Sequence, residues 1–276
     1  MCVSTGPADF VGTTLYLGRR RHERHGLIEV LGYQNTVRNL GDGPNAMVLH
    51  LPVPWLTEGS FLPVGRDGDV LDAMLKAARP VLRGGPDEPA AMSWMDGSPA
   101  VEVFEHDVYT VVLAGDPTLI PDALHRVPEH KRPVLDRELF EFYADVFPGR
   151  AIALCCFDNA DAQRAKPLFL WYPPVDRDQL VLPALDCHSG AVPDLDALVR
   201  TDHWLVFGTD EAEPGWGAEV RYSGRIRRKL RAFLPDAVLG ADFTEKLLPN
   251  GDFAIDYDDL LRGDLSGIER VRPGGA

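Results

Sequence analysis

The sequence predicts an α+β fold made largely of antiparallel β-sheets with a few packed helices. Runs typical of strands occur in clusters, and helical segments lie between the clusters, whereas a βαβ fold would alternate the two regularly. The predicted strands are 13–17, 27–33, 45–54, 101–104 with 108–113, 151–157, 168–172, 180–185 and 204–207. No solenoid-type repeat is present. We therefore expect one globular α+β domain over residues 1–262 and a flexible tail over 263–276.

Glycine and proline mark the turns between the first strands. The run 13–17 stops at Gly18, the run 27–33 follows Gly26, and 41–44 is a Gly-Asp-Gly-Pro turn. Val3 to Thr5 can form a short strand that pairs back with 13–17. The runs 101–104 and 108–113 are expected to form one long or kinked strand.

Apolar residues at helical spacing predict helices over 70–82 and 133–147. Asp67 and Asp69 lie at the favourable N-terminal end of the first helix. Asp116-Pro117 predicts the start of a short helix, because proline suits a first helical turn. The basic segment 223–233 also has an apolar helical stripe. The acidic run 252–259 is interpreted as a solvated helix start, because it lacks the pattern of a calcium-binding loop.

Composition limits the classes of function. The 276 residues are 45% hydrophobic and carry a formal net charge of −14, as in an ordinary acidic globular protein. That charge argues against nucleic acid and anionic membranes as partners, because phosphate would be repelled. The sequence shows no secretory signal and no apolar run long enough to span a membrane. We expect a cytoplasmic protein with reduced thiols.

The first two residues are the most informative feature for function. Met1 precedes Cys2, whose side chain is small enough for an aminopeptidase to remove the methionine. Cys2 would then carry a thiol and a free α-amino group on one residue. An N-terminal nucleophile enzyme needs these two groups, because the thiolate attacks a carbonyl and the amine serves as the base. The alternative is an ordinary cysteine near a chain end.

Such an enzyme also needs donors for an oxyanion and groups that hold the substrate. Asn45 is the candidate oxyanion donor, and Asn35 is a candidate for substrate binding together with Arg19 and Arg21, which can clamp a carboxylate or phosphate. The alternative roles are turn residues for the asparagines and a solvated hairpin tip for the arginines.

A second polar group follows the predicted strand 180–185. Asp186, Cys187 and His188 come directly after it, and Asp202 and His203 open the strand 204–207. If these strands adjoin, His188 can assist catalysis as a base held by a carboxylate. The same residues could bind a metal, but one cysteine without ligand pairs matches no zinc motif. The sequence therefore predicts neither a metal nor a cofactor.

Two resemblances accompany these residues. Met1-Cys2, the Pro-Asn-Ala-Met segment at 44–47 and the segment 182–190 resemble an uncharacterised family of bacterial proteins, which implies no catalytic residues. The start of the chain is also similar to N-terminal cysteine amidohydrolases, which implies an N-terminal nucleophile (Ntn) hydrolase fold. Val3 stands where the amidotransferases of that class have glycine.

The leading hypothesis is an amide hydrolase or acyl transferase that acts on a small molecule or peptide. Cys2 would be the nucleophile, His188 a helper and Asn45 an oxyanion donor. The first alternative is a non-enzymatic binding or scaffold protein, with homo-oligomerisation left open, because four aromatic residues lie in Pro- and Gly-rich segments: Trp55, Phe61, Trp94 and Trp216. The second alternative is a metal-dependent enzyme that uses the region of His188 and His203.

Overall fold

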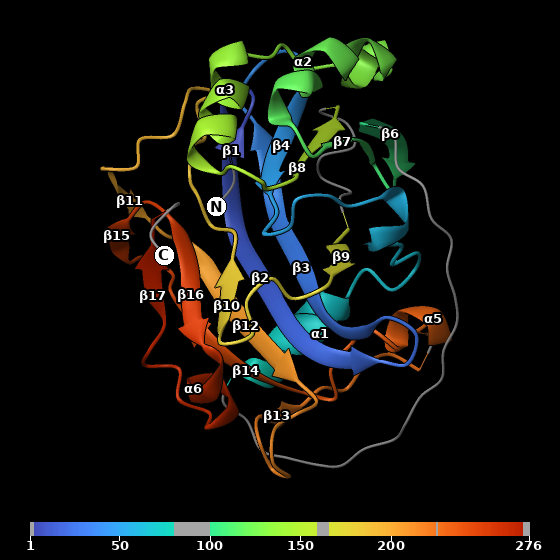
Figure 1. The fold of residues 1–276 in the computed structure, drawn as a ribbon, viewed down its shortest axis with the longest axis vertical. Coiled ribbons are helices and arrows are strands. Elements are labelled where there is room, and N and C mark those ends of the chain that lie inside the picture. The colour runs from blue at the N-terminus through green and yellow to red at the C-terminus, as the bar shows by residue number, and fades with distance from the viewer. Residues whose placement is uncertain (1–2, 80–99, 159–165, 225, 273–276) are drawn as a thin grey trace.

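Two long strands form the centre of the fold. The computed structural model describes residues 3–79, 100–158, 166–224 and 226–272. Strands β2 (Ala8–His22) and β3 (Gly26–Asn39) form an antiparallel hairpin that runs most of the length of the molecule (Figure 1). Gly26, at a φ of 69°, lies at the turn, in a backbone region that favours glycine. This hairpin is the middle of the largest sheet.

The largest sheet has seven strands in the order β13-β14-β12-β2-β3-β9-β5. Its pairings are antiparallel except for that of β12 with β2, which is parallel. The remaining strands of this sheet are β5 (Phe61–Leu62), β9 (Leu168–Tyr172), β12 (His203–Thr209), β13 (Ala218–Glu219) and β14 (Ala237–Asp242). The expected fold class, α+β with largely antiparallel sheets, is therefore confirmed.

A five-stranded antiparallel sheet lies beside it, in the order β1-β4-β8-β7-β6. Its members are β1 (Val3–Ser4), β4 (Asn45–His50), β6 (Val101–His106), β7 (Tyr109–Ala114) and β8 (Ile152–Phe157). Two small sheets join β10 (Gln179–Leu182) with β16 (Asp252–Asp256) and β17 (Glu269–Val271), and β11 (Leu198–Arg200) with β15 (Leu247–Pro249).

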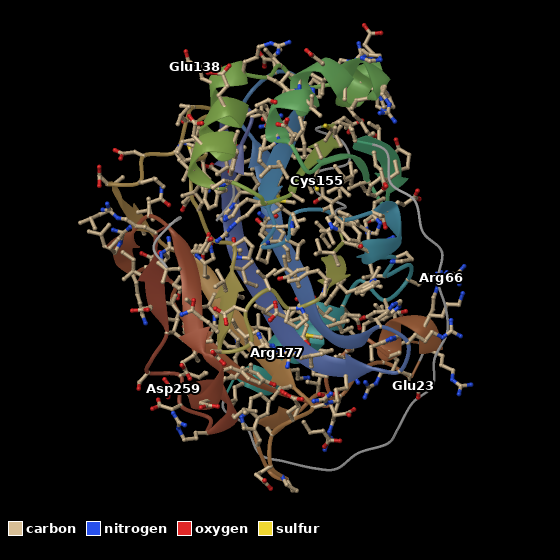
Figure 2. The ribbon with its side chains drawn as sticks, viewed as in Figure 1. Glu23, Arg66, Glu138, Cys155, Arg177 and Asp259 are labelled. Atoms are coloured by element: carbon tan, nitrogen blue, oxygen red, sulfur yellow. The ribbon has the colours of Figure 1, made fainter. Side chains whose placement is uncertain are left out.

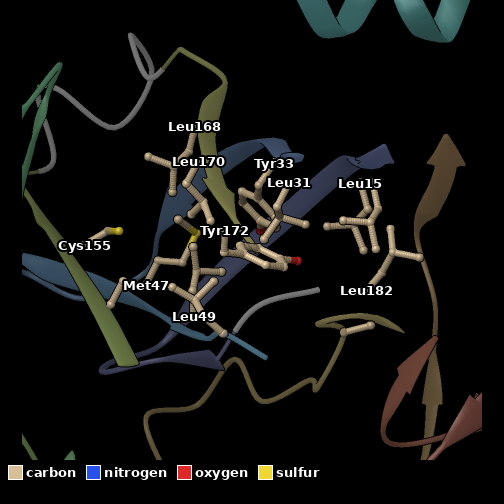
Figure 3. Packing of buried hydrophobic residues seen from close by; sticks show 14 of the residues in the cluster. Leu15, Leu31, Tyr33, Met47, Leu49, Cys155, Leu168, Leu170, Tyr172 and Leu182 are labelled. Atoms are coloured by element: carbon tan, nitrogen blue, oxygen red, sulfur yellow. The ribbon is translucent and has the colours of Figure 1, made fainter. Parts of the chain in front are cut away.

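Helices cover the outer faces of the two larger sheets. Helices α2 (Ile120–Ala123) and α3 (Arg137–Val146) pack on one face of the five-stranded sheet, and α1 (Val70–Ala78) and α5 (Arg228–Arg231) pack on the seven-stranded sheet. Helix α6 (Tyr257–Leu261) follows β16. Between the sheets lies the main core, with residues such as Leu31, Met47 and Leu170 (Figure 3). No described helix is both long enough and apolar enough to cross a membrane.

Alternation of side chains explains why these strands are buried on both faces. In β4, Met47 and Leu49 belong to the main core, whereas Ala46 and Val48 pack with the helices on the other side. Cys155 lies deep in the interior, while labelled charged residues such as Glu138 and Asp259 lie at the periphery (Figure 2). Strands buried on both faces give the continuous apolar runs seen in the sequence.

Several predicted elements differ from the structure. The runs 101–104 and 108–113 form the hairpin β6–β7, because the chain reverses around Asp107, which has a φ of 53°. Val3 and Ser4 pair with β4 and not with 13–17. The helix predicted over 133–147 begins only after Asp136, whose side chain accepts a hydrogen bond from the Glu138 N–H. Among the described residues of the segment 223–233, the helix is the single turn α5.

The C-terminal part also differs. Strand β17 lies within the range 263–276 predicted as a flexible tail, and it pairs with β16. Asp252, predicted as part of a solvated helix start, is buried at the beginning of β16. Helix α6 begins five residues later, at Tyr257, and the Asp256 side chain before it accepts hydrogen bonds from the N–H groups of Asp258 and Asp259.

Candidate functional site

The segment that follows Cys2 is held on both sides. Val3 is in register with Val48 of β4, and it also forms a parallel bridge with Cys187. The Ser4 N–H donates to the Cys187 carbonyl (3.0 Å), and the Thr5 N–H donates to the Ala46 carbonyl (3.0 Å). Cys2 itself lies outside the described residues. The structure thus fixes the three residues after the candidate nucleophile between β4 and the segment around Cys187.

Asn45, the candidate oxyanion donor, lies in this region and is buried. Its side-chain nitrogen donates to the Gly6 carbonyl (3.1 Å) and to Asn39 Oδ1 (3.2 Å), and its Oδ1 accepts from Thr5 Oγ1 (3.0 Å). Both amide hydrogens are therefore used within the protein. An oxyanion could take up one of them only by displacing the bond to the Gly6 carbonyl or the bond to Asn39.

Asp186 and His188 form a pair beside this segment. His188 Nε2 lies 2.8 Å from Asp186 Oδ1, and the imidazole ring packs against Phe10 with centroids 4.9 Å apart. Burial alone would raise the pKa of Asp186. The hydrogen bond from His188 and nearby positive charges have the opposite effect and outweigh burial, so the pKa of Asp186 is lowered. Asp186 is therefore ionised at neutral pH, and it can orient His188.

Asn250 fixes the backbone of Asp186. Its Oδ1 accepts from the Asp186 N–H (2.9 Å), and its Nδ2 donates to the carbonyls of Asp186 (2.9 Å) and Asp194 (3.0 Å). The side chain of Asn250 is buried and pairs with residue 186 as a neighbouring strand would. Asn250 could not be identified from the sequence, because a lone asparagine before a glycine is typical of a turn.

His203 lies in the same region, but its environment differs from that of His188. It is fully buried against Phe253, with ring centroids 5.7 Å apart, and burial lowers its pKa well below the ordinary value, so the ring is neutral. The charges of Arg270 and His188 add to this effect. Asp202 is occupied elsewhere, since its carboxylate accepts from the Gly12 N–H (2.5 Å) at the irregularity in β2.

Of the candidate substrate residues, the two arginines lie far from this region. Arg19 is fully buried and bonded to Glu29, whereas Arg21 is exposed and pairs with Glu211. The Ala8 N–H bonds to the His188 carbonyl, and Arg19 lies eleven positions further along β2, a span on the order of 35 Å. Asn35, on β3, donates to the Tyr33 hydroxyl (2.6 Å). No described contact connects any of the three with the Asp186–His188 pair.

A second histidine–carboxylate contact, which is buried, was not predicted. His50, at the end of β4, lies 2.8 Å from Asp252 Oδ1, and that oxygen also accepts from the Ala184 N–H (2.8 Å). Arg150 approaches the other carboxylate oxygen at 3.3 Å. These contacts tie the five-stranded sheet to the small β10-β16-β17 sheet. His50 and Asp252 are far apart in the sequence, so only the tertiary structure reveals the pair.

No set of three or more histidine, cysteine, aspartate or glutamate side chains arranged to hold a metal ion occurs among the described residues. His188 and His203 make no common contact with a carboxylate there. Cys187 Sγ instead lies near Ser189 Oγ (3.4 Å) and the Ala191 carbonyl (3.2 Å).

Comparison with known proteins gives distant structural neighbours. No protein-family model matches the chain, and no curated protein sequence matches it. The 2.7 Å crystal structure of a mutated baculovirus P35 after caspase cleavage has a TM-score of 0.42 and 10% identity, covering 94% of each chain. A 3.1 Å structure of the same kind has a TM-score of 0.39 and 14% identity, covering 79% of this chain and 70% of the other.

The crystal structure of baculovirus P35 itself has a TM-score of 0.38 and 12% identity, covering 96% of this chain and 92% of the other. At these identities and TM-scores, the likeness does not carry an activity, a ligand or a partner over to this chain.

Proposed function

We propose that the protein is a cysteine-dependent amide hydrolase or acyl transferase that uses Cys2 as its nucleophile after removal of Met1. The observation that supports this best is the pairing of Val3 with both β4 and Cys187, beside the Asp186–His188 pair. The proposal includes an Ntn-hydrolase-like arrangement, in which the nucleophile is the first residue of a strand. The substrate is a small molecule or peptide with an amide bond.

The register of the neighbouring strands favours this arrangement. Val3 pairs in parallel with Cys187, the residue that lies between Asp186 and His188 in the sequence. Val3 packs on the helix-covered side of the five-stranded sheet, with Cys187 at the edge of the same cluster. Side chains alternate along an extended chain, and His188 packs against Phe10 of the main core, on the opposite side from Cys187. The proposed reaction of Cys2 uses the groups on that side.

The chemistry then follows from one residue and its neighbours. The Cys2 sulfur attacks the amide carbonyl while its proton passes to the α-amine, whose reference pKa is ~8. The tetrahedral intermediate collapses, the C–N bond breaks, and the leaving amine takes the proton. A thioester on Cys2 remains. Water hydrolyses it in a hydrolase, and a second nucleophile accepts the acyl group in a transferase.

In this proposal His188 acts in the second half of the reaction. Its ring is about one-third exposed, so it is accessible to solvent, and Asp186 holds it through Nε2. The histidine can therefore take a proton from the attacking water or acceptor while the carboxylate stabilises the imidazolium. Asn45 is the proposed oxyanion donor only if substrate displaces its bond to Gly6 or Asn39.

Intact-protein mass spectrometry tests the first requirement. We expect the folded protein to lack Met1, because the α-amine mechanism needs the free amine of Cys2. If the methionine is retained on the folded protein, the α-amine mechanism is excluded.

Thiol labelling tests the second requirement. An activated Cys2 reacts with iodoacetamide near neutral pH well before the other cysteines. Cys155 and Cys156 are fully buried, and burial raises the pKa of Cys156 to about 12, so both stay unlabelled in the native state. Cys187 is partly exposed and is the relevant competitor. Cys2→Ala should abolish fast labelling without unfolding the protein, whereas Cys187→Ser should preserve it.

The alternative is a non-enzymatic binding or scaffold protein. Trp55 favours it, because its side chain is 67% exposed next to Pro54. Phe61 is buried, and the Trp216 indole donates to the Leu260 carbonyl (2.7 Å), so neither is available as a contact surface. Trp94 lies outside the described residues. Uniformly slow labelling of all four cysteines would favour this alternative over the enzyme.

A metal-dependent enzyme remains the other alternative, and elemental analysis tests it. One equivalent of zinc or iron, lost when His188 and His203 are both changed to Ala, would move the proposed active site from Cys2 to these histidines.

A further inference from the structure

A cavity lies between the end of β13 and helix α5, on a different part of the molecule from the Cys2 region. Its volume is about 400 Å³, which is within the range of small-molecule sites. The chain from Glu219 to Gly224 forms one wall, and Ile226, Arg231 and Asp236 complete the lining. The lining therefore combines apolar side chains with two acidic and two basic groups.

Part of this lining is held rigidly by internal contacts. The Tyr222 hydroxyl donates to the Pro235 carbonyl (2.8 Å), and the Arg231 guanidinium lies over the Tyr222 ring at 5.1 Å. Arg231 also donates to the Leu234 carbonyl (2.9 Å) and forms an ion pair with Asp236. Arg231 and Asp236 neutralise each other, and Tyr222 is held by Pro235. These three residues therefore shape the cavity, and a ligand would have to bind to other lining residues.

Two charged side chains of the lining have no such partner. Glu219 and Arg221 form no ion pair and no side-chain hydrogen bond with any described residue, and they do not pair with each other. They carry opposite charges, they are two residues apart in the sequence, and both line the cavity. One carboxylate and one guanidinium therefore remain available at the cavity wall.

We propose that this cavity binds a small zwitterion of the α-amino acid class with an aliphatic side chain. Glu219 would receive the ammonium group and Arg221 the carboxylate. Val220 and Ile226 supply the apolar surface that an aliphatic side chain would cover. A ligand with only one of the two charges would leave either Glu219 or Arg221 without a partner. This binding is independent of any chemistry at Cys2.

Three probes that share one branched side chain separate the contributions of the two charges. L-Leucine carries both charges, 4-methylpentanoate lacks the ammonium group, and 3-methylbutan-1-amine lacks the carboxylate. Each is titrated into the full-length protein while the backbone amide signals of Val220 and Ser223 are followed by NMR. We expect leucine to bind about tenfold more tightly than either single-charge probe, which corresponds to about 1.4 kcal/mol.

Variants of Glu219 and Arg221 test which residue binds the ammonium group of the ligand and which binds its carboxylate. Glu219→Gln should weaken leucine and the amine without changing the affinity for the carboxylate probe, and Arg221→Gln should do the reverse. Arg228→Gln, on an exposed residue of α5 outside the lining, is the matched control and should change nothing. Unchanged amide spectra elsewhere show that the variants fold. Equal binding of the three probes, no binding below about 10 mM, or insensitivity to both variants would overturn the proposal.

Discussion

Arg19 is held inside the protein by a carboxylate, backbone carbonyls and an aromatic ring. Its guanidinium lies 2.6 Å from Glu29 Oε1 and donates to the carbonyls of Asp176 and Gln179, and the Tyr257 ring lies over it at 4.3 Å. Burial of an arginine is costly unless its donors are satisfied, and here they are. The side chain therefore joins β2 and β3 to the segment before β10.

Replacing Arg19 should be strongly destabilising. Arg19→Met leaves Glu29 buried without its counter-charge, and breaking such a pair typically costs ~3–5 kcal/mol. Arg21→Met is the matched control on the same strand, because Arg21 is 73% exposed in its pair with Glu211 and should contribute less than ~1 kcal/mol. Urea denaturation of both variants measures the difference. Equal losses would contradict the assignment of Arg19 as an internal cross-link.

Strands β2 and β12 meet at two glycines that make room for a hydroxyl group. Gly18 and Gly208 are register partners across the parallel pair. A Cβ atom on Gly18 would lie 1.9 Å from the Tyr16 hydroxyl oxygen, and one on Gly208 would lie 3.0 Å from it. Tyr16 is fully buried under α1 and α5, so its ring cannot move aside freely. Glycine at positions 18 and 208 therefore leaves room for the Tyr16 hydroxyl, and neither glycine forms a turn.

Gly18→Ala tests this packing. The added methyl group must displace the Tyr16 hydroxyl, and overpacking of this kind costs ~1–3 kcal/mol. Gly43→Ala is the control, because a Cβ there meets nothing within 4 Å. Thermal unfolding should show a lowered Tm for the first variant and little change for the second. Gly18→Ala combined with Tyr16→Phe should recover part of the loss, since the clashing oxygen is gone.

The sequence identified most individual elements but not their partners. The runs 13–17, 27–33 and 151–157 are strands because continuous apolar and β-branched residues suit two-sided burial. The pairing of β2 with β12 and of β1 with Cys187 joins distant parts of the chain, which no local pattern encodes. In the same way, Asp186 and His188 could be found in the sequence, whereas Asn250 could not, because its role exists only once the chain has folded.

At the scale of the molecule, the Asp252 carboxylate connects its own β10-β16-β17 sheet to the five-stranded sheet. It is buried and touches His50 of the five-stranded sheet and the Ala184 N–H beside its own sheet. Burial alone would raise the pKa of Asp252, but His50, the Ala184 N–H and Arg150 outweigh it, and the pKa is lowered. The unfolded state therefore takes up a proton more readily than the folded state.

The free energy of unfolding should consequently fall as the pH drops below ~4, the ordinary range of aspartate, because protonation then favours the unfolded chain. Asp252→Asn should flatten this part of the pH profile. Asp122→Asn is the control, since Asp122 is largely exposed and its ion pair with Arg137 contributes little. Urea denaturation across pH 2.5–7 measures the slope. An unchanged slope in Asp252→Asn would contradict the lowered pKa.

Val3 pairs with β4 and with Cys187, and these two partners are synthesised at very different times. Val3 leaves the ribosome long before Cys187, and at ~5–20 residues per second the interval is roughly ten to forty seconds. Until Cys187 emerges, the beginning of the chain lacks one of its two neighbours. We expect it to remain accessible to a processing aminopeptidase during this interval and to be closed off once the segment around Cys187 has docked. The proposed removal of Met1 therefore has to precede the docking of the segment around Cys187 against Val3.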